Sequence, residues 1–153
     1  MPRTIADSSQ DKPRDRLRLW LQMLKTTRFV QTEIRARLRR DFATTLPRFD
    51  VMAALDAVDE GLRMSDISAR LMVSNGNVTG IIDRLAHEAL VMRVSIKGDR
   101  RATLVRLTPK GRRLFDDMAA AHRRWIDELL AGLSDAETAA ATAVLARTRE
   151  TGS

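Results

Sequence analysis

Two short helices followed by a basic hairpin are expected across residues 65–111, and they constrain the fold of this 153-residue chain more than any other feature. The segment SNGNVTGIIDRL starts with a serine and repeats apolar residues at helical spacing, whereas VMRVSIKGDRRATLVRLT alternates as a hairpin does. One helix of such a pair can enter the major groove of duplex DNA while the hairpin reaches the flanking minor groove. We therefore expect a mainly α-helical fold with a small β-hairpin that is suited to binding DNA.

Positive charge gathers in the same part of the chain. Positions 84–113 hold nine Lys or Arg residues against two acids, Glu88 and Asp99, and this excess equals the formal net charge of +7. The sequence pI is about 11.1. Such clustering favours a polyanionic partner, and nucleic acid is the first candidate. A basic protein without such a partner is the alternative.

The sequence lacks the residue patterns of most enzymes and metal sites. There is no Cys, which excludes disulfides, thiolate zinc sites and thiol redox sensing. The two histidines, His87 and His122, fall in different expected helices, and there is no GxSxG, HExxH or Gly-rich phosphate loop. The acids Asp56, Asp59 and Glu60 are typical of a solvated helix end. We expect no catalysis, no metal and no cofactor.

The sequence gives no sign of a membrane segment. No apolar run approaches the roughly 18 residues of a membrane-spanning helix. The stretch MPRTIADSSQDKPRD carries charges and lacks the apolar core of a signal peptide. We expect a cytoplasmic protein with no membrane partner.

A central lobe is expected between two helical arms. Residues 1–15 are polar and predict a disordered tail. The arm at 16–47 holds a long amphipathic helix and a loop, the lobe spans 48–110, and the arm at 111–150 holds two more helices. Arms with an apolar stripe need a partner, and a second copy of the chain is the simplest one, so we expect a homodimer. The stripe of the first arm consists of Leu17, Trp20, Leu24, Val30, Ile34 and Leu38.

Local signals predict where the helices begin. Pro47 is expected to end a loop before a second helix, and Ser65 and Ser74 to cap the third and fourth helices. Thr108, followed by a proline, is expected to open a fifth helix. Ser134, with a glutamate three residues later, is expected to form a capping box at the start of the last helix.

The residues LMVSNGNVTGIIDRL, Arg93, GDRRATLVRLT and the following PKG form a recognisable set. Together they resemble the MarR family of winged helix-turn-helix transcription regulators, and the resemblance covers about residues 16–150. It implies a winged helix-turn-helix with terminal dimerisation helices, a homodimer and a pseudo-palindromic operator in double-stranded DNA. For many members it also implies release from DNA when a small aromatic ligand binds.

Two positions depart from the pattern of that family. Ala89 stands where a glycine usually ends the recognition helix, and alanine in left-handed geometry would cost about 1 kcal/mol. We therefore expect the helix end to differ locally. Gly80 stands where many relatives carry an arginine, so contacts made by that arginine cannot be carried over to this chain.

The amino-terminal turns of the recognition helix are expected to face base edges. Asparagine can bind adenine through two hydrogen bonds, and glycine lets the backbone approach closely. The alternative is that Ser74 and Asn77 only cap the helix, and a capping Ser74 could also contact a phosphate. The candidates for DNA contact are Ser74, Asn75, Gly76, Asn77 and Thr79.

Further DNA contacts are expected from the helix end and the hairpin, the wing in this family. Arg70, Arg84 and Lys97 are candidates for phosphate contacts, although Arg84 could pair with an acid instead. In the wing, Asp99 and Arg101 match the family's Asp-x-Arg, in which the carboxylate can orient the guanidinium for a narrow minor groove. Arg100 adds charge beside them, and a solvated turn is the alternative.

A second basic cluster suggests an anionic effector. Positions 12–40 hold ten Lys or Arg residues against two acids, on an arm that the family places away from most of the DNA. One interpretation is a site for an aromatic acyl-coenzyme A thioester, and the alternative is a solvated helix face. The stretch TLPRFDVMAAL resembles relatives that respond to hydroxycinnamate-type compounds. The candidate ligand residues are Arg35, Arg37, Arg48, His122 and Trp125, of which His122 could equally be a core residue.

We therefore expect a homodimeric regulator, most simply a repressor released by an aromatic acid or its coenzyme A thioester. An activator, or a regulator without a ligand, is the nearest alternative. From other classes, an acyl-coenzyme A-binding protein or metabolic enzyme would not bind duplex DNA, and a nucleoid protein would bind it with little sequence preference. The Asp-x-Arg wing and the polar recognition helix argue against these classes.

Overall fold

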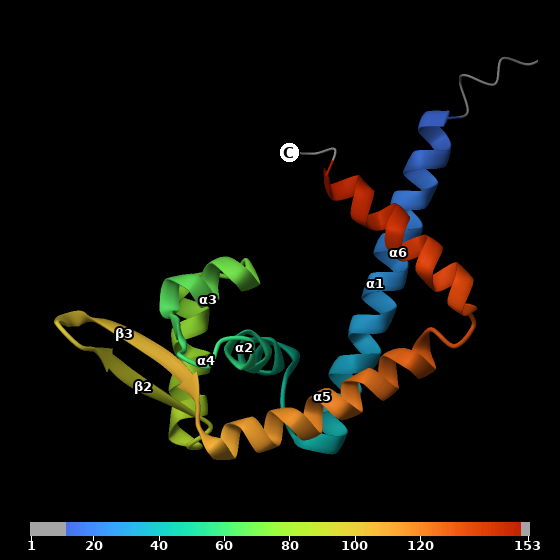
Figure 1. Cartoon of the computed structure of the whole chain (residues 1–153). Helices are drawn as coiled ribbons and strands as arrows, with labels where there is room; N and C mark the ends of the chain where they lie inside the picture. The colour runs from blue at the N-terminus through green and yellow to red at the C-terminus, as the bar shows by residue number, and fades with distance from the viewer. Residues whose placement is uncertain (1–11, 151–153) are drawn as a thin grey trace, which may run out of the picture. The chain divides into compact units, whose positions relative to one another are not determined.

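The computed structural model describes residues 12–150, except for the side chains of Arg100 and Arg101. The chain forms two compact units, one up to Thr45 and one from Leu46 onward. Along the chain the elements are α1 (Lys12–Phe42), α2 (Leu46–Asp56), β1 (Leu62–Arg63), α3 (Met64–Leu71), α4 (Asn75–His87), β2 (Val91–Ile96), β3 (Asp99–Leu107), α5 (Pro109–Leu129) and α6 (Asp135–Glu150) (Figure 1).

Helix α1 and the short segment up to Thr45 make up the described part of the first unit. The helix begins at Lys12, so the expected boundary of the tail at residue 15 is wrong, and the rest of that tail lies outside the described residues. Pro13 fits the first turn of a helix, where its missing N–H costs nothing. The apolar stripe is unevenly buried: Leu38 is fully buried, whereas Leu17 and Trp20 are 56% and 52% exposed.

The second unit is organised around α2. This helix contacts α3, α4, α5 and strand β3, and in Figure 1 it is seen nearly end-on. Burial of apolar side chains from all these elements supplies the main stabilisation of the lobe. The largest fully buried side chains of this unit are Val51, Met52, Leu55, Ile67, Val78, Ile82, Leu85, Val105 and Met118.

Two helix starts differ from expectation. Helix α2 already begins at Leu46, so Pro47 lies in its first turn rather than at the end of a loop. Helix α3 begins at Met64, and its N-cap position, Arg63, makes no side-chain capping bond. The expected cap by Ser65 is therefore wrong: strand β1 leads directly into α3, which places Ser65 inside the first turn.

The hairpin belongs to a three-stranded antiparallel sheet in which β3 lies between β1 and β2. Leu62 of β1 pairs with Val105. Strand β1 has only two residues, so an alternation of polar and apolar residues could not predict it. Gly98 has φ of 91° in the turn, and the register shifts between Ser95 and Ile96. In Figure 1 the hairpin of β2 and β3, hereafter the wing, projects beyond the helices of the lobe.

The junction between the recognition helix α4 and helix α5 is tightly closed. Ala89 has φ of 59°, and the Leu90 N–H donates to the Leu85 carbonyl at 2.9 Å, which together end α4 in a left-handed C-cap. The hydroxyl of Thr108 accepts from the Gly111 N–H at 2.9 Å and donates to the Ala89 carbonyl at 2.6 Å. The predicted caps by Ser74 and Thr108 are confirmed, and Ala89 does adopt left-handed geometry.

The last helix, α6, is the least buried helix of the second unit. The expected capping box at α6 is present, because the Ser134 N–H donates to Glu137 Oε2 at 2.8 Å and the Glu137 N–H donates to Ser134 Oγ at 3.3 Å. Helix α6 holds no buried residue. Within residues 12–150, no helix is both long and apolar enough to cross a membrane.

Candidate nucleic-acid interface

The amino end of α4 presents polar groups that the fold does not use. Ser74 Oγ accepts the Asn77 N–H at 3.4 Å and so caps the first turn of the helix. The side chains of Asn75 and Asn77 are exposed. A Cβ on Gly76 would meet nothing within 4 Å, so packing within the chain does not require glycine at this position. This end of α4 is open to an external partner.

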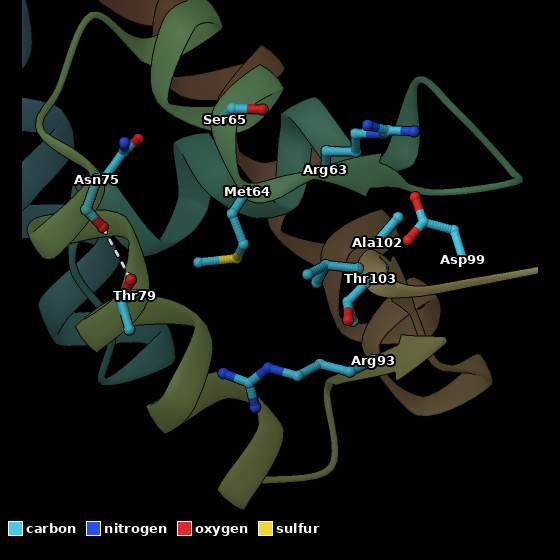
Figure 2. Close-up of a pocket in the computed structure, with 10 residues that line it drawn as sticks. Arg63, Met64, Ser65, Asn75, Thr79, Arg93, Asp99, Ala102 and Thr103 are labelled. Carbon is cyan, nitrogen blue, oxygen red and sulfur yellow. Dashed lines mark hydrogen bonds between the residues drawn. The ribbon is translucent and has the colours of Figure 1, made fainter. Parts of the chain in front are cut away.

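An open groove of about 690 Å³ lies between α4, the start of α3 and the sheet. Figure 2 shows Asn75 and Thr79 on the α4 side, with Arg93, Asp99 and Thr103 on the strands opposite. The Thr79 hydroxyl donates to the Asn75 carbonyl at 2.9 Å and can still accept a hydrogen bond. The groove therefore offers both donors and acceptors beside the exposed end of α4. The remaining lining residues are Arg63, Met64, Ser65, Ala102 and Val105.

An ion pair joins the recognition helix to the wing. A guanidinium nitrogen of Arg93 on β2 donates to Asp83 Oδ1 on α4. The neighbouring Arg84 is exposed, and it takes part in none of the ion pairs between described side chains. The two neighbouring residues therefore point in different directions: Asp83 faces the wing, and Arg84 faces solvent.

The tip of the wing is charged and exposed. Lys97 and Asp99 are both exposed, on either side of Gly98. The expected pairing of Asp99 with Arg101, and the contribution of Arg100, fall on side chains outside the described residues. The ammonium of Lys97 is exposed at the turn, which the positive φ of Gly98 makes possible.

The carboxyl end of α4 is held by charged groups from two other helices. Arg48 of α2 binds Glu88 through its two terminal guanidinium nitrogens, Nη1 and Nη2, with Nη1 at 3.1 Å from Oε1. Lys110 of α5 donates to the Glu88 carbonyl at 2.9 Å. Hydrogen bonding by Arg48 lowers the pKa of Glu88 below its ordinary value, despite an opposing effect of burial.

The candidate ligand residues are divided between the two units. Arg35 and Arg37 lie on α1, whereas Arg48, His122 and Trp125 belong to the second unit. His122 is partly buried, with its ring centroid 4.9 Å from that of Phe49, and burial lowers its pKa while Asp50 opposes the shift. Trp125 is only 5% exposed. Acids and histidines within residues 12–150 form no group of three or more that could hold a metal ion.

Sequence reasoning missed several members of this interface. Arg63 and Thr103 line the groove, and Arg93 was noted only as part of a family pattern. The position of Arg63 depends on tertiary structure, because the pairing of Leu62 with Val105 brings Arg63 beside β3. A local sequence pattern does not predict this pairing. The partner of Arg48 lies 40 residues away, and no local pattern connects them.

Comparisons with known proteins address the family directly. Residues 44–103 match the model of the MarR family. A solved MarR family transcriptional regulator from Silicibacter pomeroyi is 31% identical, with 94% of this chain and 99% of that chain covered and a TM-score of 0.79. The chain belongs to the MarR family of transcriptional regulators.

Curated relatives agree with this family over shorter stretches. The HTH-type transcriptional regulator MhqR of Bacillus subtilis is 31% identical over 55% of this chain and 58% of that protein. The transcriptional activatory protein BadR of Rhodopseudomonas palustris is 35% identical over 49% of this chain and 44% of that protein. The chain thus spans about half the length of these curated relatives. The predicted winged-helix fold, and a MarR regulator rather than an enzyme, are confirmed.

Proposed function

We propose that this MarR-family chain binds a pseudo-palindromic sequence in double-stranded DNA as a homodimer and represses transcription. The observation that carries the proposal is the exposed amino end of α4, where Ser74 serves the cap and Asn75 and Asn77 are exposed. Asparagine can read adenine in the major groove through two hydrogen bonds. Ser74, Gly76 and Thr79 would approach the duplex with them.

Phosphate contacts would supply most of the affinity. Lys97, Arg84 and Arg70 are exposed around α3, α4 and the wing, where they can reach the sugar–phosphate backbone. Asp99, Arg100 and Arg101 would carry the wing into the minor groove. Each neutralised phosphate releases counterions, so affinity must fall steeply as salt rises.

The homodimer is supported by apolar side chains that one copy of the chain leaves exposed. On α1, Trp20 and Phe29 are 52% and 55% exposed, and on α6 Val144 and Leu145 are 45% and 42% exposed. Side chains of this size on two terminal helices fit an interface between copies. Sedimentation should find a dimer at micromolar concentration, and a well-folded monomer would contradict this part of the proposal.

Selection from a pool of random duplexes tests DNA binding. The wild-type protein should enrich a sequence with two-fold symmetry, and its affinity for that duplex should fall by orders of magnitude between about 50 and 200 mM salt. Arg101→Ala should weaken binding by about 1–3 kcal/mol, because the wing loses a minor-groove cation. Arg149→Ala on α6 is the matched control and should bind as the wild type does. A pool without enrichment would contradict the proposal.

The effector is proposed to be an aromatic acid or its coenzyme A thioester. Supporting observations are the ring cluster of Phe49, Phe115 and His122 and the exposed basic face of α1, including Arg35. Arg37 on α1 and Trp125 on α5 are the further candidates for contact with the effector. Arg48 is bound to Glu88, so an anion at Arg48 would have to displace that carboxylate.

Calorimetry distinguishes the two effectors. A thioester should bind more tightly than its free acid, because its phosphates add charge-assisted hydrogen bonds, and its affinity should fall as salt rises. Arg35→Ala and Arg37→Ala should weaken binding of the thioester and leave operator binding nearly unchanged. Equal affinity for acid and thioester would contradict a role of these arginines in binding the effector and would support the alternative of a solvated helix face.

The direction of regulation has a second candidate. BadR is described as a transcriptional activatory protein and shares 35% identity with this chain over 49% of its residues. An activating role is therefore the alternative to repression. Transcription in vitro from a promoter carrying the selected duplex separates the two, since a repressor lowers the transcript yield and an activator raises it.

A further inference from the structure

The pair formed by Arg48 and Glu88 joins the start of α2 to the residue that follows α4. Two guanidinium nitrogens meet two carboxylate oxygens, with Nη1 at 3.1 Å from Oε1, so the pair fixes orientation as well as distance. The Arg48 side chain is 17% exposed and that of Glu88 is 45% exposed. A pair in this position is less screened than a fully exposed one.

Both ends of this contact stand on well-packed neighbours. Phe49, next to Arg48, is 7% exposed and packs against Phe115 at a ring-centroid distance of 5.6 Å. On the α4 side, Leu90 is 4% exposed, and its N–H closes the helix on Leu85. The arginine thus extends from a fixed base to a fixed helix end.

Lys110 adds a second hold at the same place. Its ammonium donates to the Glu88 carbonyl at 2.9 Å. A cation at the carboxyl end of a helix also interacts favourably with the helix dipole. Helices α2 and α5 therefore both grip the carboxyl end of α4, at the far end from Asn75 and Asn77.

The length of α4 turns a small tilt into a large displacement. Its 13 residues span about 20 Å, so a tilt of about 5° about the carboxyl end moves the amino end by about 1.7 Å. Hydrogen bonds to bases hold only over a few tenths of an ångström around 2.9 Å. Control of the tilt at one end therefore controls base contact at the other.

We infer that Arg48 is a positioning residue for DNA recognition, which sets the angle of α4 through Glu88 and does not touch DNA itself. The inference rests on the proposed function, because it assigns a role within sequence-specific DNA binding. It predicts that Arg48 governs discrimination between sequences. A residue that contacts phosphate would instead change affinity for every duplex alike.

Charge reversal within the full-length protein tests the inference. The measured quantity is the ratio of affinities for the selected duplex and for an unrelated duplex, in which changes of overall charge cancel. Arg48→Glu and Glu88→Arg should each lower this ratio about fivefold, a size expected for coupled charges in contact. The double variant restores the pair with opposite polarity and should return to within about twofold of the wild type.

Two further variants separate positioning from general stability. Arg48→Lys keeps the charge but loses the contact through two nitrogens, so its ratio of affinities should lie between those of the wild type and Arg48→Glu. This variant replaces a charge reversal that fails to fold. Asp56→Asn removes one of the two carboxylates that Arg112 of α5 binds, Asp56 at 3.3 Å and Asp59 at 3.2 Å, and does not involve α4. It should lower stability slightly and leave the ratio unchanged.

The outcomes are distinct. Single reversals with the wild-type ratio would show that Arg48 does not position α4. A double variant that stays as poor as the single ones would attribute the loss to something other than the pair, and would equally overturn the inference. A wild-type protein that enriches no sequence would overturn the proposed function and the inference with it.

Discussion

Gly111 lies directly against the backbone of Leu90. A Cβ on this glycine would stand 1.9 Å from the Leu90 carbonyl oxygen and 2.8 Å from its carbonyl carbon. The same oxygen accepts the Thr108 N–H at 3.0 Å, so it cannot move away without loss of that bond. The start of α5 therefore packs directly against the chain that leaves α4. This close approach explains why glycine follows Pro109 and Lys110 in the sequence.

Gly111→Ala should destabilise the protein by about 3 kcal/mol or more, because a backbone carbonyl would have to yield to the added methyl group. Urea unfolding followed by circular dichroism measures the loss. Gly80→Ala on α4 is the control, because a Cβ there meets nothing within 4 Å. Alanine at this position should raise the free energy of unfolding by about 0.5–1 kcal/mol. Equal effects at both glycines would contradict the close approach.

Ala89→Gly should stabilise the protein by about 1 kcal/mol, since Ala89 has φ of 59° and glycine adopts this geometry without a steric penalty. The free energy of unfolding is the measurement. Ala86→Gly, within the last turn of α4, should instead destabilise by a similar amount, because glycine costs entropy inside a helix. A destabilising effect at both positions would mean that Ala89 does not adopt left-handed geometry.

His122 should make stability depend on pH. Burial lowers its pKa from 6.5, so the folded state disfavours the charged form. The stabilisation is complete above the unfolded pKa of about 6.5 and is lost as pH falls toward the lower folded pKa, because the unfolded chain then binds more protons. His122→Phe should remove this part of the pH dependence.

Unfolding in urea between pH 7.5 and acid pH, compared between variant and wild type, gives the measurement. As pH falls, the free energy of unfolding should decrease more for the wild type than for His122→Phe. His87→Gln, at an exposed position of α4, should follow the wild type. A pH-independent difference for His122→Phe would contradict the burial of an uncharged imidazole.

Helix caps and strand alternation could be predicted because their signals are local. Ser74 and Thr108 cap α4 and α5 through backbone N–H groups only three residues away. Ser65 failed as a cap because β1 pairs with β3 and carries the chain into α3 earlier, a tertiary effect. Ala89 was expected to change the helix end, yet closure by Leu90 and Thr108 outweighs a penalty of about 1 kcal/mol.

The candidate site could be predicted in its residues but not in its contacts. The sequence pointed to Asn75, Asn77 and Lys97, and all three are exposed. It could not pair Asp83 with Arg93, or Arg48 with Glu88, because such pairs depend on how helices and strands meet. Arg48 was a ligand candidate because the stretch TLPRFDVMAAL around it resembles relatives that respond to hydroxycinnamate-type compounds, and its pairing with Glu88 supports another role.

The base preference of Asn77→Ala tests the central claim most directly, namely that the amino end of α4 reads sequence. Selection from random duplexes should show that the variant loses preference at one base pair in each half-site, worth about 1–3 kcal/mol, and keeps the others. Gln31→Ala on α1 should reproduce the wild-type profile in full. An unchanged profile for Asn77→Ala, at wild-type affinity, would contradict the account.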